Sequence, residues 1–256
     1  MAQNDVADLI RRGRTDLVFE LLRTPAGRQQ LPGLMTWFVY YNDLTALRAI
    51  LDAGLDLTGL DLDRELGHAA FFGHWKIADF LLAHGASARW TQPDTGETPL
   101  HSALCKAGRP HYANVVRLLL DAGADPNART IPGAETGGFM RDVRTRGETP
   151  LHRAAAFGDE TIIQLLIDKG AGRELRDAHG DTPLSWASWH LRPGAILALL
   201  APWATHHLRH ARRNLARRPR PRLGRHGSEN HGRVSAAQPL SPNARNRREG
   251  SASGGS

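Results

Sequence analysis

The chain has 256 residues, and its 33 Lys and Arg against 26 Asp and Glu give a net charge of +7. Its single cysteine excludes an intramolecular disulfide framework, no apolar run approaches the roughly 20 residues of a membrane helix, and nothing at the N-terminus resembles a secretion signal. The basic charge lies at one end, because residues 201–256 hold twelve Arg, no Lys and two Glu, leaving 21 basic and 24 acidic side chains in residues 1–200. We therefore expect a cytoplasmic protein with no membrane span.

Residues 1–33 predict a pair of N-terminal capping helices. Apolar residues recur at helical spacing in two runs, 6–10 and 17–22, on either side of Gly13. A helix pair of this kind would cover the first apolar face of whatever follows it.

A motif repeats through the middle of the chain. Thr-Pro-Leu-His occurs at residues 98–101 and 149–152, and Thr-Pro-Leu-Ser occurs at 182–185. Thr supplies an oxygen for the free amides of a first helical turn, and Pro fits the next position because no N–H is needed there. Each copy therefore predicts the start of a helix, and a second apolar helix pattern follows it.

The spacing of these units gives a period. Gly54 and Gly85, which end two units, are 31 residues apart, and Thr149 and Thr182 are 33 apart. Short helices repeated at such a period indicate a solenoid, because each pair must bury its apolar face on its neighbours.

The pattern resembles the ankyrin repeat family, through Thr-Pro-Leu-His and through Gly-Ala-Asp-Pro-Asn at residues 123–127. The resemblance implies an all-α ankyrin-repeat solenoid of stacked helix-turn-helix units between residues 34 and 200. Five repeats are expected, starting near residues 34, 65, 98, 149 and 182, of which the first two are degenerate.

The regular spacing is broken between Thr98 and Thr149, which lie 51 residues apart. Four extra residues lie around residues 109–112, and fourteen precede Thr149, where residues 130–147 predict an elongated hairpin loop beside the concave surface. Aromatic, Met and Arg side chains are typical interface anchors. The predicted binding residues are Trp90, Tyr112, Phe139, Met140, Arg141, Arg144 and Arg146. Alternatively, Phe139 and Met140 pack down on the helices.

Two other sets of residues invite a functional interpretation. Trp186 and Trp189 lie three apart on one helix face, where they either close the end of the core or expose an anchor. Cys105 falls on an expected inner helix, where we expect a buried thiol.

The histidines do not predict a metal site or a catalytic site. His68, His101 and His152 occur once per unit, and helices about 8 to 10 Å apart cannot bring all three to one ion. The resemblance implies a structural role for them, bonding neighbouring loops and helix starts. His206 and His210 have helical metal-pair spacing but lack the Glu of a metalloprotease motif. No phosphate-binding glycine loop, nucleophile elbow or paired carboxylates appear, so we predict no catalytic residue, metal or cofactor.

After Leu200 the apolar periodicity stops, and residues 201–256 are expected to be a disordered basic tail. The tail is either solvated without a selected partner or binds anionic surfaces or nucleic acid without sequence specificity, since no aromatic follows Trp203. Arginine without lysine is also what a shifted reading frame in a GC-rich gene would produce.

The resemblance implies a non-catalytic module, expected to be a monomer, that binds a partner protein on its concave face and finger loops. An inhibitor or antidote of one dedicated enzyme would use the same surface. A third possibility is binding to anionic surfaces through the tail.

Overall fold

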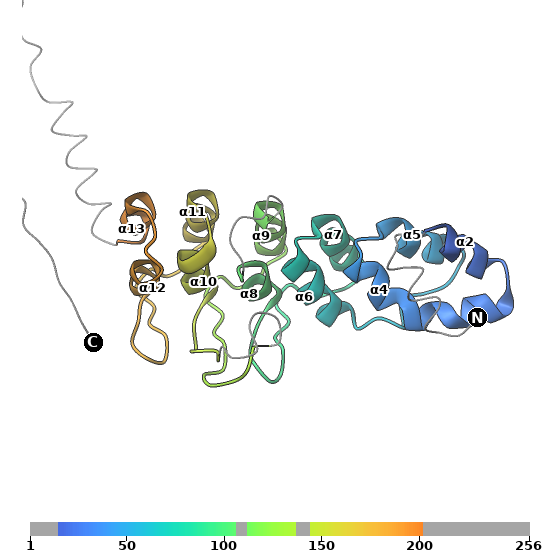
Figure 1. Ribbon diagram of the computed structural model, residues 1–256, viewed down its shortest axis with the longest axis horizontal. Helices are drawn as coiled ribbons and strands as arrows, with labels where there is room; N and C mark the ends of the chain where they lie inside the picture. Colours follow the sequence, from blue (N-terminus) through green and yellow to red (C-terminus); the bar gives the residue numbers. More distant parts are fainter. Residues whose placement is uncertain (1–14, 106–111, 137–143, 202–256) are drawn as a thin grey trace, which may run out of the picture. The chain divides into compact units, whose positions relative to one another are not determined.

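Residues 15–105, 112–136 and 144–201 are described by a computed structural model of the chain. Helices in these ranges form an inner row and an outer row (Figure 1). The inner helices are α4 (Met35–Tyr40), α6 (Leu62–Phe72), α8 (Pro99–Ala103), α10 (Pro150–Phe157) and α12 (Pro183–Trp189). The outer helices are α5 (Leu44–Asp52), α7 (Trp75–Ala83), α9 (Tyr112–Asp121), α11 (Glu160–Asp168) and α13 (Gly194–Leu200). The predicted all-α solenoid is confirmed, and within the described ranges the only β pairing is an isolated bridge between Glu135 and Arg144.

A short helical segment precedes the repeats. Its elements are α2 (Asp16–Leu22), α3 (Pro25–Gln30) and the 3-10 turn η1 (Leu31–Leu34). Helix α2 packs on α5, and η1 runs directly into α4. This segment therefore covers the first repeat where capping helices were expected in residues 1–33, although residues 1–14 lie outside the described part of the chain.

The Thr-Pro pairs begin the inner helices as predicted. Thr98 and Thr182 each accept a hydrogen bond from the amide three residues further on, and Pro occupies the first helical position. Glycines end the first, third and fourth outer helices in the left-handed conformation, with φ of 77° at Gly54, 88° at Gly123 and 93° at Gly170. Local sequence signals therefore start α8 and α12 and end α5, α9 and α11.

The apolar core lies between the two rows of helices. Leu100 and Leu151 from inner helices and Ile77, Leu119 and Ile163 from outer helices are fully buried. Burial of each such side chain contributes about 1.5–3 kcal/mol, whereas isolated helices of this length are marginal in water. The stability of each repeat therefore depends on the repeats beside it.

The stack is thinnest in the middle of the inner row. Helix α8 has only five residues, and its contact with α10 is the smallest between neighbouring inner helices. Residues 106–111, which include most of the predicted four-residue insertion, lie outside the described residues. The space between α8 and α10 is filled by charged and polar side chains, which belong to the candidate site.

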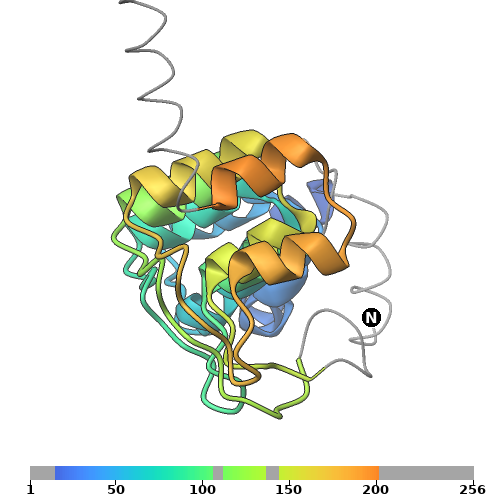
Figure 2. The same ribbon diagram turned by 90° about the vertical axis from the view of Figure 1, so that its left-hand side faces the viewer.

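The loops that precede α8, α10 and α12 project beyond the inner row as fingers (Figures 1 and 2). The finger predicted at residues 130–147 has a paired base, because the Gly133 amide donates to the Thr145 carbonyl and the Thr145 amide donates to the Ala134 carbonyl, at 2.7 and 2.8 Å. Residues 137–143 at its tip are outside the described part. The hairpin prediction is thus confirmed for the base of the finger.

Candidate functional site

The exposed side of the inner row carries aromatic side chains in two hollows. On α4 and α12, the two aromatic residues that line a hollow are three positions apart. On α10, Phe157 lies four positions after Arg153, which lines the same hollow. On each of these helices the lining side chains therefore share one face. We call this surface the aromatic groove, and it comprises Trp37, Tyr40, Phe71, Phe72, Trp90, Phe157, Trp186 and Trp189.

The first hollow lies over α4, α6 and α8 and has a volume of about 510 Å³. Five rings line it, namely Trp37, Tyr40, Phe71, Phe72 and Trp90. Its polar lining includes Gln92, Glu97 and Ser102. A volume of this size is typical of cavities that bury a ligand or an anchoring side chain.

The rings of the first hollow are held by one another. The Tyr40 ring meets the Phe72 ring edge-on at 4.8 Å between centroids, and Phe72 meets Phe71 at 5.0 Å. Trp90 packs over α6 at Gly67, where an added Cβ would lie 3.8 Å from the indole. Tyr40 still exposes 46% of its surface. The hollow is therefore preformed and accessible.

The second hollow lies between α8, α10, α12 and the finger base and has a volume of about 240 Å³. Arg146 reaches across it, with Nη2 3.0 Å from Asp181 Oδ2 and Nε 3.2 Å from Asp177 Oδ2 in an ion pair that lacks hydrogen-bond alignment. Its guanidinium carbon lies 5.7 and 5.1 Å from the ring centroids of Trp186 and Trp189, within cation–π range. Trp189 is 57% exposed.

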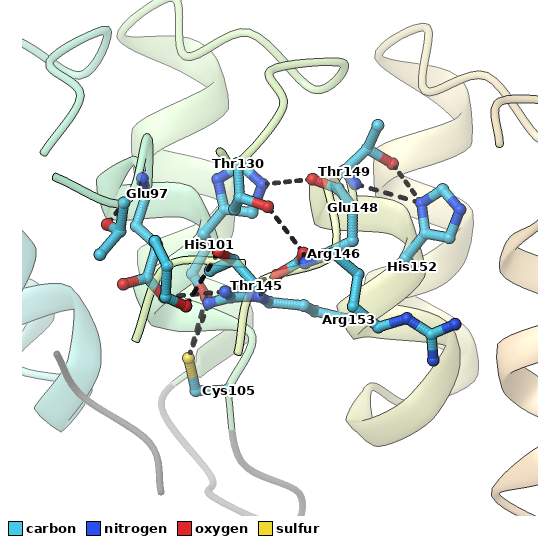
Figure 3. Close-up of polar contacts among 12 residues, drawn as sticks. Glu97, His101, Cys105, Thr130, Thr145, Arg146, Glu148, Thr149, His152 and Arg153 are labelled. Atoms are coloured by element: carbon cyan, nitrogen blue, oxygen red, sulfur yellow. Dashed lines mark hydrogen bonds and ion pairs between the residues drawn. The ribbon is translucent and has the colours of Figure 1, made fainter. Parts of the chain in front are cut away.

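A buried ion cluster, whose polar contacts are shown in Figure 3, contributes side chains to both hollows. Arg153 extends from α10 toward α8 and places Nη2 2.8 Å from Glu97 Oε1 and 2.6 Å from Glu148 Oε1. Its Nη1 donates to the His101 carbonyl and to Cys105 Sγ, at 3.3 and 3.1 Å. All of these side chains are buried. One arginine thus occupies the space that the short α8 leaves open.

The ionisation of the cluster follows from its contacts. Burial alone would raise the pKa of Glu148, but the Arg153 charge and hydrogen bonds from the Thr130 hydroxyl and the Arg146 amide lower it to about 2. Burial raises the pKa of the Cys105 thiol, so this cysteine is a neutral buried group, as expected. The cluster therefore pairs carboxylates with one guanidinium and offers no activated nucleophile.

His101 and His152 have the structural role that the resemblance implied. In each, Nδ1 accepts the amide of the Thr that begins the helix, and Nε2 donates to a carbonyl of the next finger, Glu148 for His101 and Asp181 for His152. Burial, reinforced by the Arg153 charge, lowers the pKa of His101 to about 3, and burial also lowers the pKa of His152. Both rings are neutral at physiological pH.

The equivalence of His68 with these histidines was wrong. The register can be counted back from the glycine that caps the end of each inner helix. His152 lies six positions before Gly158, whereas the residue six positions before Gly73 is Gly67. His68 is therefore one position further along. Its side chain is 43% exposed, lines the first hollow and lies 3.2 Å from Glu65 Oε2.

The predicted binding residues fall in different places. Trp90 lines the first hollow, while Arg144 and Arg146 line the second. Arg144 also holds the finger base, because its Nη1 donates to the Gly133 carbonyl at 2.7 Å. Tyr112 requires a correction, since it is only 3% exposed and its hydroxyl donates to the Phe71 carbonyl at 2.5 Å, which places it in the core. Phe139, Met140 and Arg141 lie outside the described residues.

Sequence reasoning missed most of the groove. Trp37, Tyr40, Phe71, Phe72 and Phe157 all lie on inner helices, and this excess of aromatics was the available signal. Arg153 directly follows His152 and precedes three alanines, so a charge on a buried face was also visible. Its partners Glu97 and Cys105 could not be predicted, because they belong to the preceding repeat.

No helix within the described ranges is long and apolar enough to cross a bilayer. In the same ranges, no three His, Cys, Asp or Glu side chains come together in a way that could hold a metal ion.

Comparison with known proteins gives a family match over more than half of the chain. The family described as "Ankyrin repeats (3 copies)" matches residues 34–130 and 133–208. Human Rabankyrin-5 is 35% identical over 114 residues, which are 44% of this chain and 9% of that protein. The Drosophila melanogaster neurogenic locus Notch protein is 32% identical over 143 residues, 56% of this chain and 4% of that protein. A putative ankyrin repeat-containing protein of Treponema pallidum is 30% identical over 147 residues, 52% of this chain and 43% of that protein. The chain therefore spans less than half the length of these relatives.

Proposed function

The chain belongs to the ankyrin repeat family, whose repeats generally mediate protein–protein interaction, and from this premise we propose that it binds a partner protein without catalysis, in the aromatic groove and at the finger base. The observation that carries the proposal is the row of aromatic side chains exposed on the inner helices. Tyr40 and Trp189 are about half exposed to solvent, and exposed apolar side chains gathered on one surface mark interaction sites. Aromatic side chains are also enriched at interface hot spots.

The groove is suited to binding because it is built before a partner arrives. Its rings contact one another, and Arg146 is fixed by Asp177 and Asp181. A preformed surface loses little conformational entropy on association, so more of the contact energy appears as affinity. The finger residues Phe139, Met140 and Arg141 are proposed to extend the same surface.

Affinity capture from native lysate with the full-length chain tests this proposal. The double variant Tyr40→Ala, Trp189→Ala should lose captured proteins, because it removes one exposed ring from each hollow. The matched control is Phe19→Ala, Trp75→Ala, which removes two exposed rings outside the groove, on α2 and α7, and should leave capture intact. Equal capture by both double variants, with unchanged circular dichroism, would refute a role for the groove.

The captured proteins also distinguish a scaffold from a dedicated inhibitor or antidote. A single stoichiometric enzyme that loses activity in the complex would establish the inhibitor role, whereas several unrelated proteins would establish a scaffold. Truncating Phe139, Met140 and Arg141 together should weaken capture in either case while leaving the fold unchanged.

The charge of residues 201–256 supports a separate, weaker activity toward anionic surfaces. Twelve Arg and two Glu give this segment +10, whereas residues 1–200 carry −3. Deleting residues 201–256 should abolish retention on heparin without changing capture that depends on the groove. Cytoplasmic location and a monomeric state belong to the same proposal.

A further inference from the structure

The buried ion cluster carries an excess of negative charge. Glu97 and Glu148 share the single guanidinium of Arg153, so the three groups together have a net charge of −1. Which of the two carboxylates carries the excess charge follows from the hydrogen bonds and ion pairs that each one makes.

Glu148 is fully engaged. Its Oε1 accepts from Arg153 Nε and Nη2 at 2.9 and 2.6 Å, and its Oε2 accepts from the Thr130 hydroxyl and the Arg146 amide at 2.6 and 2.7 Å. Among the described residues, the Glu97 carboxylate is contacted only by Arg153, through Oε1. The uncompensated charge therefore belongs to Glu97, which lines the first hollow and not the second.

The rings of the first hollow add to this negative potential. An aromatic ring presents electron density on its face and attracts a cation placed over it, most strongly when the ring is Trp or Tyr. Trp37, Tyr40 and Trp90 all line the hollow with Glu97. Among its described lining residues, the only permanently charged cation is Arg64, whose side chain is exposed at the rim.

From this arrangement we propose that the first hollow binds a basic side chain, Arg or Lys, presented by the partner protein. The cationic head pairs with Glu97 while its aliphatic stem and flanking apolar residues pack on the rings. This inference rests on the proposed function and names the chemistry of the partner at one end of the groove.

Other occupants fit the first hollow less well. An acidic side chain would face Glu97 across a cavity whose walls repel negative charge. A purely apolar anchor would take water away from Glu97, Gln92 and Ser102 without replacing their hydrogen bonds, which costs free energy. A cation with a long aliphatic stem satisfies both the carboxylate and the rings.

Peptide titration of the full-length chain tests the inference without the natural partner. The probes are acetyl-Leu-Arg-Leu-amide and the same peptide with citrulline, which keeps the shape of Arg but has no charge. The Arg peptide should bind about tenfold more tightly, as expected for a cation–π contact in a partly desolvated site. In nitrogen-15 spectra, the indole signals of Trp37 and Trp90 should shift, while those of Trp186 and Trp189 stay in place.

Two variants and one control separate binding from folding. Glu97→Gln should reduce the preference for Arg, because only the rings would then attract the cation. Since Glu97 also contacts Arg153, Tyr40→Leu provides an independent test at an exposed ring and should reduce the preference for Arg several-fold. Trp75→Leu, at an exposed ring on α7 outside the groove, should leave the preference unchanged. Equal affinity of the unaltered protein for both peptides, or shifts confined to Trp186 and Trp189, would overturn the inference.

Failure of this inference and failure of the proposed function give different results. If the peptides show no charge preference while protein capture still requires Tyr40 and Trp189, the groove binds partners by other chemistry. If capture is independent of both residues, the proposed function fails whatever the peptides do.

Discussion

At the scale of single residues, Arg153 has the largest consequence for the molecule. It lies on α10 but contacts Glu97 and Cys105, which flank α8, as well as Glu148 beside its own helix. A buried ion pair adds little stability relative to apolar packing, but removing one member leaves charge without a counter-ion. The cluster is therefore sensitive to the loss of this one side chain.

Arg153→Ala is expected to lower the free energy of unfolding by about 3–5 kcal/mol, because Glu97 and Glu148 would remain buried without a cation. Urea denaturation monitored by circular dichroism measures this. The control is Arg117→Ala at an exposed position on α9, which should change stability by less than about 0.5 kcal/mol. A loss below about 1 kcal/mol at Arg153 would contradict the structural role assigned to it.

Stability should fall as the pH drops from 7 to 5. Burial lowers the pKa of His101 to about 3 and lowers that of His152, so below the unfolded value near 6.5 the unfolded chain binds more protons than the folded one. Their contribution is complete above pH 6.5 and is lost as the pH falls toward the folded values. His101 alone should cost about 2 kcal/mol between pH 7 and pH 5. Denaturation at both pH values measures the loss, and titration of the His101 ring near pH 6.5 in the folded protein would disprove it.

At the scale of helices, the sequence predicts most of the fold from local signals. The Thr-Pro pairs start α8, α10 and α12 where expected, and α13 ends at Leu200, where the apolar pattern stops. Helix α6 was less predictable, because its first turn is capped by Asp61 and no Thr-Pro pair marks its start.

The candidate site was less predictable than the fold. Trp90 lines the first hollow, whereas Tyr112 is buried, because it docks against α6 through Gly73 and the Phe71 carbonyl. The sequence did not distinguish these two aromatic residues. His68 was assigned one position out of register. Contacts between repeats decide these placements, and no pattern within a single repeat contains them.

Helix α11 offers a test of local capping. Asp159 is exposed and its side chain accepts the Ile162 amide at 2.8 Å, so its main contribution is the cap itself. Asp159→Ala should destabilise the protein by about 1 kcal/mol, while Asp159→Asn, which keeps an acceptor oxygen, should be close to neutral. Thermal or urea denaturation of the two variants decides this, and equal stability would show that the cap is dispensable.

At the scale of the described repeats, the inner row of helices is most weakly packed between α8 and α10. Helices α6 and α8 pack closely, as do α10 and α12, whereas α8 and α10 depend on the ion cluster. Repeat arrays behave as chains of nearest-neighbour contacts, so the weakest contact limits how cooperatively they unfold. The cluster therefore couples the repeats before it to those after it.

Arg153→Ala should uncouple these two groups of repeats. The unaltered protein is expected to unfold in one transition, and the variant in two, because the nearest-neighbour contact between α8 and α10 would fall below that of the flanking pairs. Replacing every tryptophan except Trp37, or every one except Trp189, with phenylalanine would let fluorescence report separately on the repeats before α8 and the repeats after it. Coincident transitions for both reporters in the variant would refute the uncoupling.

The shared arginine also bears on how such an array can change by recombination. Repeats are usually thought of as interchangeable units that can be duplicated, deleted or transplanted. Here Arg153 and its Glu97 counter-ion are encoded in successive units, so a crossover between them could bury the Glu97 carboxylate without its cation. Residues 97–153 are thus expected to be inherited as one block, with unit gain and loss confined to the stretches on either side.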